Sequence, residues 1–193
     1  MPEKRTLYTR NVWLTASLLV AVAAVFLVYT ALERRVDNAG EARFVSMQLA
    51  DELRQSSDDL TRMARTYVVT GDPAYKKYYQ EILDIRDGKL PRPIAYQSIY
   101  WDRVVANKTM ARPSEGQHIS LLDLMRQAGY SAEEFHMLAL AKANSDTLTR
   151  TEFDAMALMD DTGPQAAASR SKALQMMHDD QYHRNKVMIM RPI

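Results

Sequence analysis

Twenty consecutive residues without a charge, Trp13 to Leu32, constrain this chain more than any other feature of its sequence. A helix of that length rises about 30 Å, the thickness of the hydrocarbon core of a bilayer. Trp13 and Tyr29 lie near the two ends of the run, where aromatic rings favour the headgroup level. The sequence therefore predicts a transmembrane helix over residues 13–32.

Two other interpretations of this segment are a buried core helix and a cleaved signal peptide. A core helix of this length usually has a polar face, and the apolar part of a signal peptide spans about 7–15 residues before a small-residue cleavage site. Here bulky residues, Phe26 to Tyr29, continue to the boundary. We predict an uncleaved anchor, with residues 1–12 in the cytoplasm and 33–193 outside it. Arg34 and Arg35 weaken the charge bias for that orientation.

Composition excludes several classes of protein. The 25 basic residues nearly cancel the 24 acidic ones, which argues against a nucleic-acid partner, and the absence of cysteine excludes disulfides, thiolate metal sites and cysteine nucleophiles. With 6 glycines and no glycine-rich phosphate-binding motif, a nucleotide-binding fold is not expected. A lack of cysteine is also compatible with an extracytoplasmic domain.

Beyond the apolar run, a stripe with a period near 3.5 predicts that one helix continues from the membrane to Thr70. The stripe consists of Ala42, Ser46, Leu49, Leu53, Ser56, Leu60, Met63 and Tyr67, and the charged residues expected on the solvated faces are Asp51, Glu52, Arg54, Asp58 and Asp59. Gly71 is expected to end this helix, and Asp72 to cap a second one that starts at Pro73.

The pattern of the remaining residues predicts further helices on both sides of one irregular insert. A helix over 73–87 is expected to pack its tyrosines against the first; Gly88 and a Pro-Arg-Pro string then break it, and 94–116 is the least regular part. A short helix over 120–127 and a capping box at Ser131 and Glu134 follow. The next helix carries a second stripe, which comprises Phe135, Leu138, Ala141, Ser145, Leu148, Glu152, Ala155 and Met159. Residues 165–190 are expected to be helical, with Leu174, Met177, Tyr182, Val187 and Ile189 as core candidates.

Together these segments predict an all-α fold, in which a transmembrane helix continues into an elongated antiparallel helical bundle. The short helices and the loop insert are expected at the membrane-distal end. Three long helices do not complete a four-helix bundle, so the short second helix or a partner chain is expected to supply the fourth helix. We expect the chain to be a fragment that stops before a second transmembrane helix.

Two groups of residues have the composition of a possible site. Asp179 and His183 have the i,i+4 spacing of metal ligands, but neighbouring charges favour a solvated polar face, so no metal, cofactor or catalytic residue is predicted. Aromatic and charged residues in and near the insert suggest a small-ligand pocket in which arginine would hold a carboxylate. This candidate ligand site comprises Arg62, Arg65, Tyr96, Tyr100, Trp101, Asp102 and Arg103. The alternative is that the aromatic rings only close the hydrophobic core.

Several strings, among them TYVVTGDPAYKKYY, GKLPRPIAYQSIYWD, AKANSDTLTRTEFDAM and QYHRNKVMIMRPI, make the chain resemble the extracytoplasmic sensor regions of bacterial transmembrane receptors. These receptors include histidine kinases, often hybrid kinases, chemotaxis receptors and diguanylate cyclases. The resemblance implies a homodimer in the inner membrane with its main domain in the periplasm. It also implies a signal-transduction input module, with no enzyme activity of its own, that passes the binding of a small molecule or periplasmic partner to a cytoplasmic output, most readily a histidine kinase. The alternatives are a chemotaxis receptor or a membrane-tethered scaffold bundle without a ligand.

Overall fold

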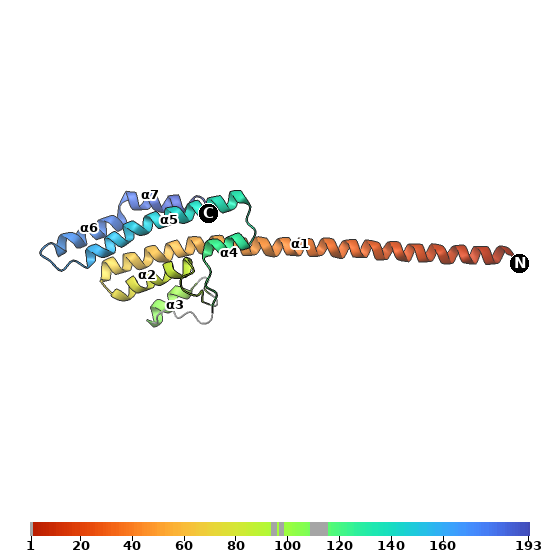
Figure 1. Ribbon diagram of the computed structural model, residues 1–193, viewed down its shortest axis with the longest axis horizontal. Coiled ribbons are helices and arrows are strands. Elements are labelled where there is room, and N and C mark those ends of the chain that lie inside the picture. The colour runs from red at the N-terminus through yellow and green to blue at the C-terminus, as the bar shows by residue number, and fades with distance from the viewer. Residues whose placement is uncertain (1, 94–95, 97–98, 109–115) are drawn as a thin grey trace. The chain divides into compact units, whose positions relative to one another are not determined.

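The computed structural model describes residues 2–93, 96, 99–108 and 116–193, with the side chains of 2–12 and 38–39 left aside (Figure 1). This part of the chain contains helices and no strand, as the all-α prediction requires. It divides into two compact units, residues 1–44 and 45–193, which are described separately. The helices are α1 (Pro2–Thr70), α2 (Pro73–Arg86), α3 (Tyr100–Asn107), α4 (Leu121–Gln127), α5 (Ala132–Met159), α6 (Ala166–His178) and α7 (Asp180–Met190).

The first unit is helical and carries the predicted apolar segment. Of the described helices, α1 alone is long and apolar enough to cross a membrane, and this property resides in its part near the N-terminus. The large side chains of the segment are uncovered, with Trp13 exposed by 76% and Phe26 by 64%. Apolar side chains that nothing in the chain covers are typical of a surface that faces lipid or another apolar partner.

In the second unit, the last part of α1 buries the stripe that its sequence predicted. Leu53, Leu60 and Met63 are almost fully buried, and burial begins at Leu49, while Ala42, in the first unit, is exposed. Figure 1 shows α2 on one side of this part of α1 and α5 on the other, and hydrogen bonds from Tyr182 and Lys186 bring α7 to α1 as well. The hydrophobic contacts among these helices form the core of the unit.

The end of α1 and the start of α2 follow the predicted turn chemistry. Gly71 adopts a positive φ of 70°, which costs a residue without a Cβ little, and its amide donates to the Tyr67 carbonyl at 2.7 Å. The Asp72 carboxylate accepts from the Ala74 amide at 2.9 Å, and Pro73 is the first residue of α2. The predicted capping box is also present at the start of α5, between Ser131 and Glu134.

The single helix expected over residues 165–190 is wrong, because the chain breaks between α6 and α7. Asp179 is extended there, with ψ of 166°, and its carboxylate caps α7 by accepting from the Tyr182 amide at 2.7 Å. Of the five predicted core positions, Met177, Tyr182 and Ile189 are buried, while Leu174, before the break, and Val187, after it, are 41% and 54% exposed.

The insert contains a short helix, α3, as the prediction of a short helix and loop expects, and its described residues contact the side of α1. Arg92 pairs with Glu52, and Asp102 pairs with Arg62, both before α1 ends at Thr70. The chain before the insert and the chain after it come close together, since a Cβ added to Gly88 would lie 2.6 Å from the Ser120 amide nitrogen.

Candidate functional site

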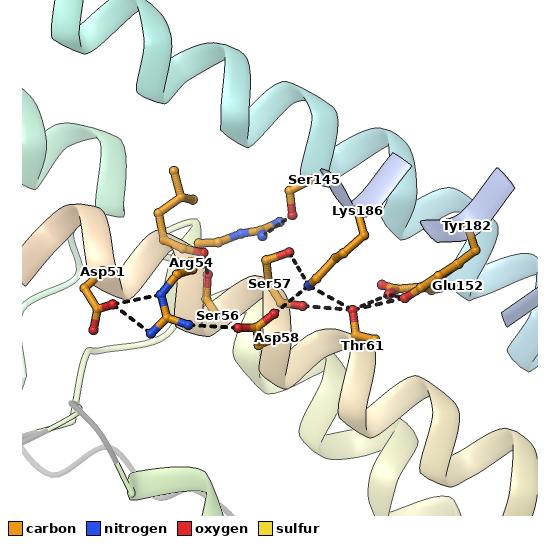
Figure 2. Close-up of polar contacts among 12 residues, drawn as sticks. Asp51, Arg54, Ser56, Ser57, Asp58, Thr61, Ser145, Glu152, Tyr182 and Lys186 are labelled. Atoms are coloured by element: carbon orange, nitrogen blue, oxygen red, sulfur yellow. Dashed lines mark hydrogen bonds and ion pairs between the residues drawn. The ribbon is translucent and has the colours of Figure 1, made fainter. Parts of the chain in front are cut away.

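A buried carboxylate on α5, Glu152, is the centre of a polar cluster inside the second unit (Figure 2). The sequence places Glu152 on the apolar stripe of α5, and the structure buries it to 2% exposure. We call the group formed by Glu152, Thr61, Tyr79, Tyr182 and Lys186 the Glu152 cluster. A buried carboxylate is costly unless hydrogen bonds satisfy it, so its partners determine what the cluster can do.

Three hydroxyl groups from three other helices converge on this carboxylate. Tyr182 of α7 donates to Oε1 of Glu152 at 2.5 Å, and Tyr79 of α2 donates to Oε2 at 2.7 Å. Thr61 of α1 lies 3.3 Å from Oε1. The carboxylate therefore joins α1, α2, α5 and α7 at one level of the core.

A lysine on α7 supplies the positive charge of the cluster. The Lys186 ammonium donates to Thr61 Oγ1 at 3.1 Å and to Ser57 Oγ at 2.9 Å, and it forms a 3.0 Å ion pair with Asp58. Figure 2 shows Thr61 between Lys186 and Glu152. Asp58 is about half exposed, so the cluster extends from the surface to the buried carboxylate.

Burial shifts the pKa of each of the four titratable members of this cluster. Loss of water raises the pKa of Glu152, an effect that the hydrogen bonds from Tyr182 and Tyr79 oppose. Burial likewise lowers the pKa of Lys186, against the attraction of Asp58. Burial also raises the pKa of Tyr79 and of Tyr182, with the Glu152 charge adding to it, so both phenols remain neutral donors at ordinary pH.

Two carboxylates of α1 are also buried, although the sequence pattern predicts them on solvated faces. Glu52 pairs with Arg92 of the insert, and Asp59 pairs with Arg62 at 2.7 Å. Burial raises the pKa of Asp59 to about 6, which the Arg62 charge only partly offsets. The prediction was wrong here because a period of 3.5 describes one stripe, whereas the insert covers a second face of α1.

Two aromatic residues of the predicted ligand site are buried in the core. Trp101 is 2% exposed, its indole Nε1 donates to the Tyr96 hydroxyl at 3.1 Å, and its ring contacts those of Tyr78 and Tyr100. Arg92 lies over the Tyr96 ring, 5.4 Å from its centre. The rings pack against one another, the arrangement described by the alternative in which they close the hydrophobic core.

The charged residues of the predicted ligand site separate into two groups. Arg62 lies between Asp59 and Asp102. Arg65 points elsewhere: its Nε donates to the Met177 carbonyl at 3.0 Å, and its guanidinium lies 4.9 Å from the centre of the Tyr182 ring. Arg103, on α3, is exposed. The structure therefore brings Arg62 to the insert and Arg65 to the Glu152 cluster.

The histidines do not form a metal centre in the described residues, where no group of three or more metal-ligating side chains occurs. The Asp179 carboxylate serves as the cap of α7, and the His183 ring packs edge-on against Tyr182. His183 also lines an open hollow on the surface of α7, together with Asp180, Gln181, Arg184, Asn185, Val187 and Met188.

Comparison with known proteins gives no match to a family model, to a curated protein or to a solved structure. The site must therefore be interpreted from its own chemistry. Its hydroxyls, carboxylate and ammonium satisfy one another inside the core. This arrangement can hold four helices in register and can redistribute protons among its members. The sequence signal for it was an acid at a core position of the α5 stripe.

Proposed function

We propose that this chain is the input module of a membrane signal receptor. It senses a small molecule or a periplasmic partner and passes a conformational change to a cytoplasmic output, for which a histidine kinase is the first candidate and a chemotaxis receptor or diguanylate cyclase the alternatives. One observation carries the proposal. A single helix, α1, includes both the apolar residues 13–32 and the buried stripe that begins at Leu49.

The physical argument is that a helix transmits displacement along its axis. An event that shifts α1 against its neighbours in the second unit would also displace the apolar segment, because the intervening residues belong to the same helix. The contacts of α1 favour an antiparallel bundle. Tyr182 of α7 contacts Thr61 of α1, and Lys186, four residues later on α7, contacts Ser57, four residues earlier on α1, so the two helices run in opposite directions.

The proposal includes an arrangement in the cell. Residues 13–32 anchor the chain in a bacterial inner membrane, the main domain lies in the periplasm, and two copies form a homodimer. Exposed apolar residues of α1 support the last point, since Phe44 and Met47 are both more than 60% exposed. A second copy would cover them.

The topology can be tested with single cysteines, because the natural chain has none. Ala168→Cys, on an exposed position of α6, should react with a membrane-impermeant thiol reagent in intact spheroplasts. Thr6→Cys, which precedes the apolar segment, should react only after the membrane is opened. Equal labelling of both positions, or a chain trimmed after residue 32 in the soluble fraction, would contradict the anchor.

Signal transmission needs a separate test. In the full chain, reconstituted in liposomes, Met47→Cys should form a disulfide-linked dimer on oxidation, and an effective stimulus should change the rate. A panel of metabolites is applied, and thermal unfolding of the same samples reports binding. Ala168→Cys serves as the control for random collision. If no compound or periplasmic extract changes either the rate or the melting temperature, direct sensing loses its support.

The packing of the insert favours a second candidate, a membrane-tethered interaction bundle without a ligand. Tyr96 and Trp101 lie in the core, where a pocket would require them to line an open space. In this case, cross-linking in cells should capture one membrane protein reproducibly, and capture should not depend on any added metabolite. A sensor would instead respond to a compound in the absence of that protein.

A further inference from the structure

A continuous line of hydrogen-bonding groups joins the surface of the second unit to the buried Glu152. Half-exposed Asp58 pairs with Lys186, and Lys186 donates to Thr61 Oγ1. The Tyr182 hydroxyl lies 3.0 Å from Thr61 Oγ1 and 2.5 Å from Glu152 Oε1. Each link is within hydrogen-bond distance, so a proton can move along the line by exchange between neighbouring groups.

The same atoms satisfy both protonation states of Glu152. When the carboxylate is ionised, the Tyr182 hydroxyl donates to it. When Glu152 is protonated, its own O–H donates to the Tyr182 oxygen, Tyr182 donates to Thr61 Oγ1, and Thr61 donates to the Ser57 carbonyl at 3.0 Å. A hydroxyl both donates and accepts, so the change requires only rotation of O–H bonds. Tyr79 donates to Oε2 in both states.

Charged groups near Glu152 or its tyrosine partners come from α1, α2 and α7. On α1, Arg65 lies over the Tyr182 ring, and Asp58 pairs with Lys186. On α2, the charge of buried Arg86 acts on Tyr79, and its guanidinium donates to Ser145 and Asp146 of α5. On α7, the charge of Lys186 favours the ionised carboxylate, and the His183 ring packs edge-on against Tyr182. The titratable partners at hydrogen-bond distance are the two tyrosines.

We propose that the Glu152 cluster is a reversible binding site for one proton, loaded from water through Lys186, Thr61 and Tyr182, and that α7 is the helix whose packing responds. The uptake is a simple protonation of the carboxylate, with water as the proton source. Once Glu152 is neutral, Lys186 keeps its charge and is drawn toward Asp58 and water. α7 carries both Lys186 and Tyr182, so it receives both changes. The raised pKa of Glu152 supports this site. The sensory use of the proton rests on the proposed function.

The binding step is tested on the full chain in lipid nanodiscs by infrared difference spectra recorded as the pH is lowered. Asp59→Asn is the parent of the series, because buried Asp59 also takes up a proton near pH 6 and would add a band of its own. The parent should show a band of a protonated carboxyl group in an apolar environment, and adding Glu152→Gln should remove it. Adding Glu133→Gln, at an exposed position of the same helix, should keep it. If the band is missing from the parent or survives Glu152→Gln, there is no proton site at Glu152.

A second variant keeps the test valid if Glu152→Gln does not fold. Tyr182→Phe removes a hydrogen bond that favours the ionised carboxylate, so the midpoint pH of the band should rise, while Tyr75→Phe should leave it unchanged. An equal midpoint with and without Tyr182→Phe would show that Tyr182 is not part of the proton site.

The response of α7 is measured by amide hydrogen exchange above and below that midpoint. The α7 amides of wild type should exchange at different protection levels in the two states, and those of Glu152→Gln should stay in the low-pH pattern. Exchange that does not follow the band would refute the α7 response. Because these measurements need no output module, a proton site that titrates in a chain without signalling activity would reject the proposed function alone.

Discussion

The phenol of Tyr182, on the last helix, donates a 2.5 Å hydrogen bond to the buried carboxylate of Glu152 on α5. The two residues are 30 positions apart in the chain, and the bond joins the segment after the Asp179 break to the centre of the core. A hydrogen bond to a charged group inside a protein is stronger than one between neutral groups, and its loss leaves the charge underpaired. This bond therefore gives the first prediction.

Tyr182→Phe should destabilise the folded chain by about 2 kcal/mol, because it removes one of the donors that satisfy Glu152 without changing the shape of the ring. The measurement is chemical unfolding of the full chain in detergent, followed by circular dichroism. Tyr75→Phe is the matched control and should change the free energy of unfolding by less than about 0.5 kcal/mol. Similar effects of the two substitutions would mean that the Glu152 bond adds nothing.

Arg92→Met should cost about 3 kcal/mol, because it leaves the buried Glu52 carboxylate of α1 without its cation. The double variant Glu52→Leu with Arg92→Met should recover much of the lost stability, since an apolar pair then fills the same space. The test is a double-mutant cycle on the free energy of unfolding. Strict additivity of the two single changes would show that the pair does not hold the insert to α1.

The pH dependence of stability should contain a contribution from Asp59. Its pKa is raised to about 6 in the folded chain from an ordinary value of 3.8, so the folded state binds the proton more tightly than the unfolded state. This contribution to stability is complete below about pH 3.8 and is lost as the pH rises through 6. Asp59→Asn should abolish it. Between pH 4 and 7, wild type should thus lose about 1–2 kcal/mol relative to the variant, the full linkage being reduced because water screens part of the carboxyl.

The same pH series on Asp154→Asn provides the control. Asp154 lies at an exposed position of α5 and is not among the charges that act on Asp59, so this variant should keep the pH dependence of wild type. If the free energies of unfolding of wild type and Asp59→Asn differ by the same amount at every pH, Asp59 does not contribute to the pH dependence of stability.

Trp101→Ala should destabilise the chain by about 3–5 kcal/mol, the usual cost of emptying the space of a large buried aromatic side chain. Arg103→Ala, at the exposed position two residues later, should be nearly neutral. Thermal unfolding of both variants distinguishes core packing from a ligand role. If Trp101→Ala kept full stability and lost the response to a metabolite, the pocket interpretation would replace the packing one.

The sequence predicted those parts of the fold that depend on local chemistry. The turn at Gly71 and Asp72 and the capping box at Ser131 follow from side chains that bond the backbone a few residues away, and both are present. The stripe of α1 was also correct from Leu49 onward. The break at Asp179 was missed, although an aspartate can cap a helix, because nothing nearby in the sequence interrupts the helical pattern.

The candidate site was predicted less completely, because its chemistry depends on residues far apart in the chain. Arg62 and Arg65 are three positions apart, yet one meets the insert and the other meets α6 and α7. Glu52 and Asp59 were expected in water and are buried. Glu152 was correctly placed on the buried stripe. Its partners on α1, α2 and α7 could not be predicted, because they are distant from it in the sequence.

By itself, the sequence determined the apolar segment, the all-helical composition and most helix ends, since these depend on side-chain polarity and on contacts within a turn or two. The tertiary structure alone decided which charged groups are buried and which of them meet. The physical reason is that the charge state and hydrogen bonding of a group depend on what excludes water from it. For Glu152 and Asp59, water is excluded by helices and loops that are distant in sequence.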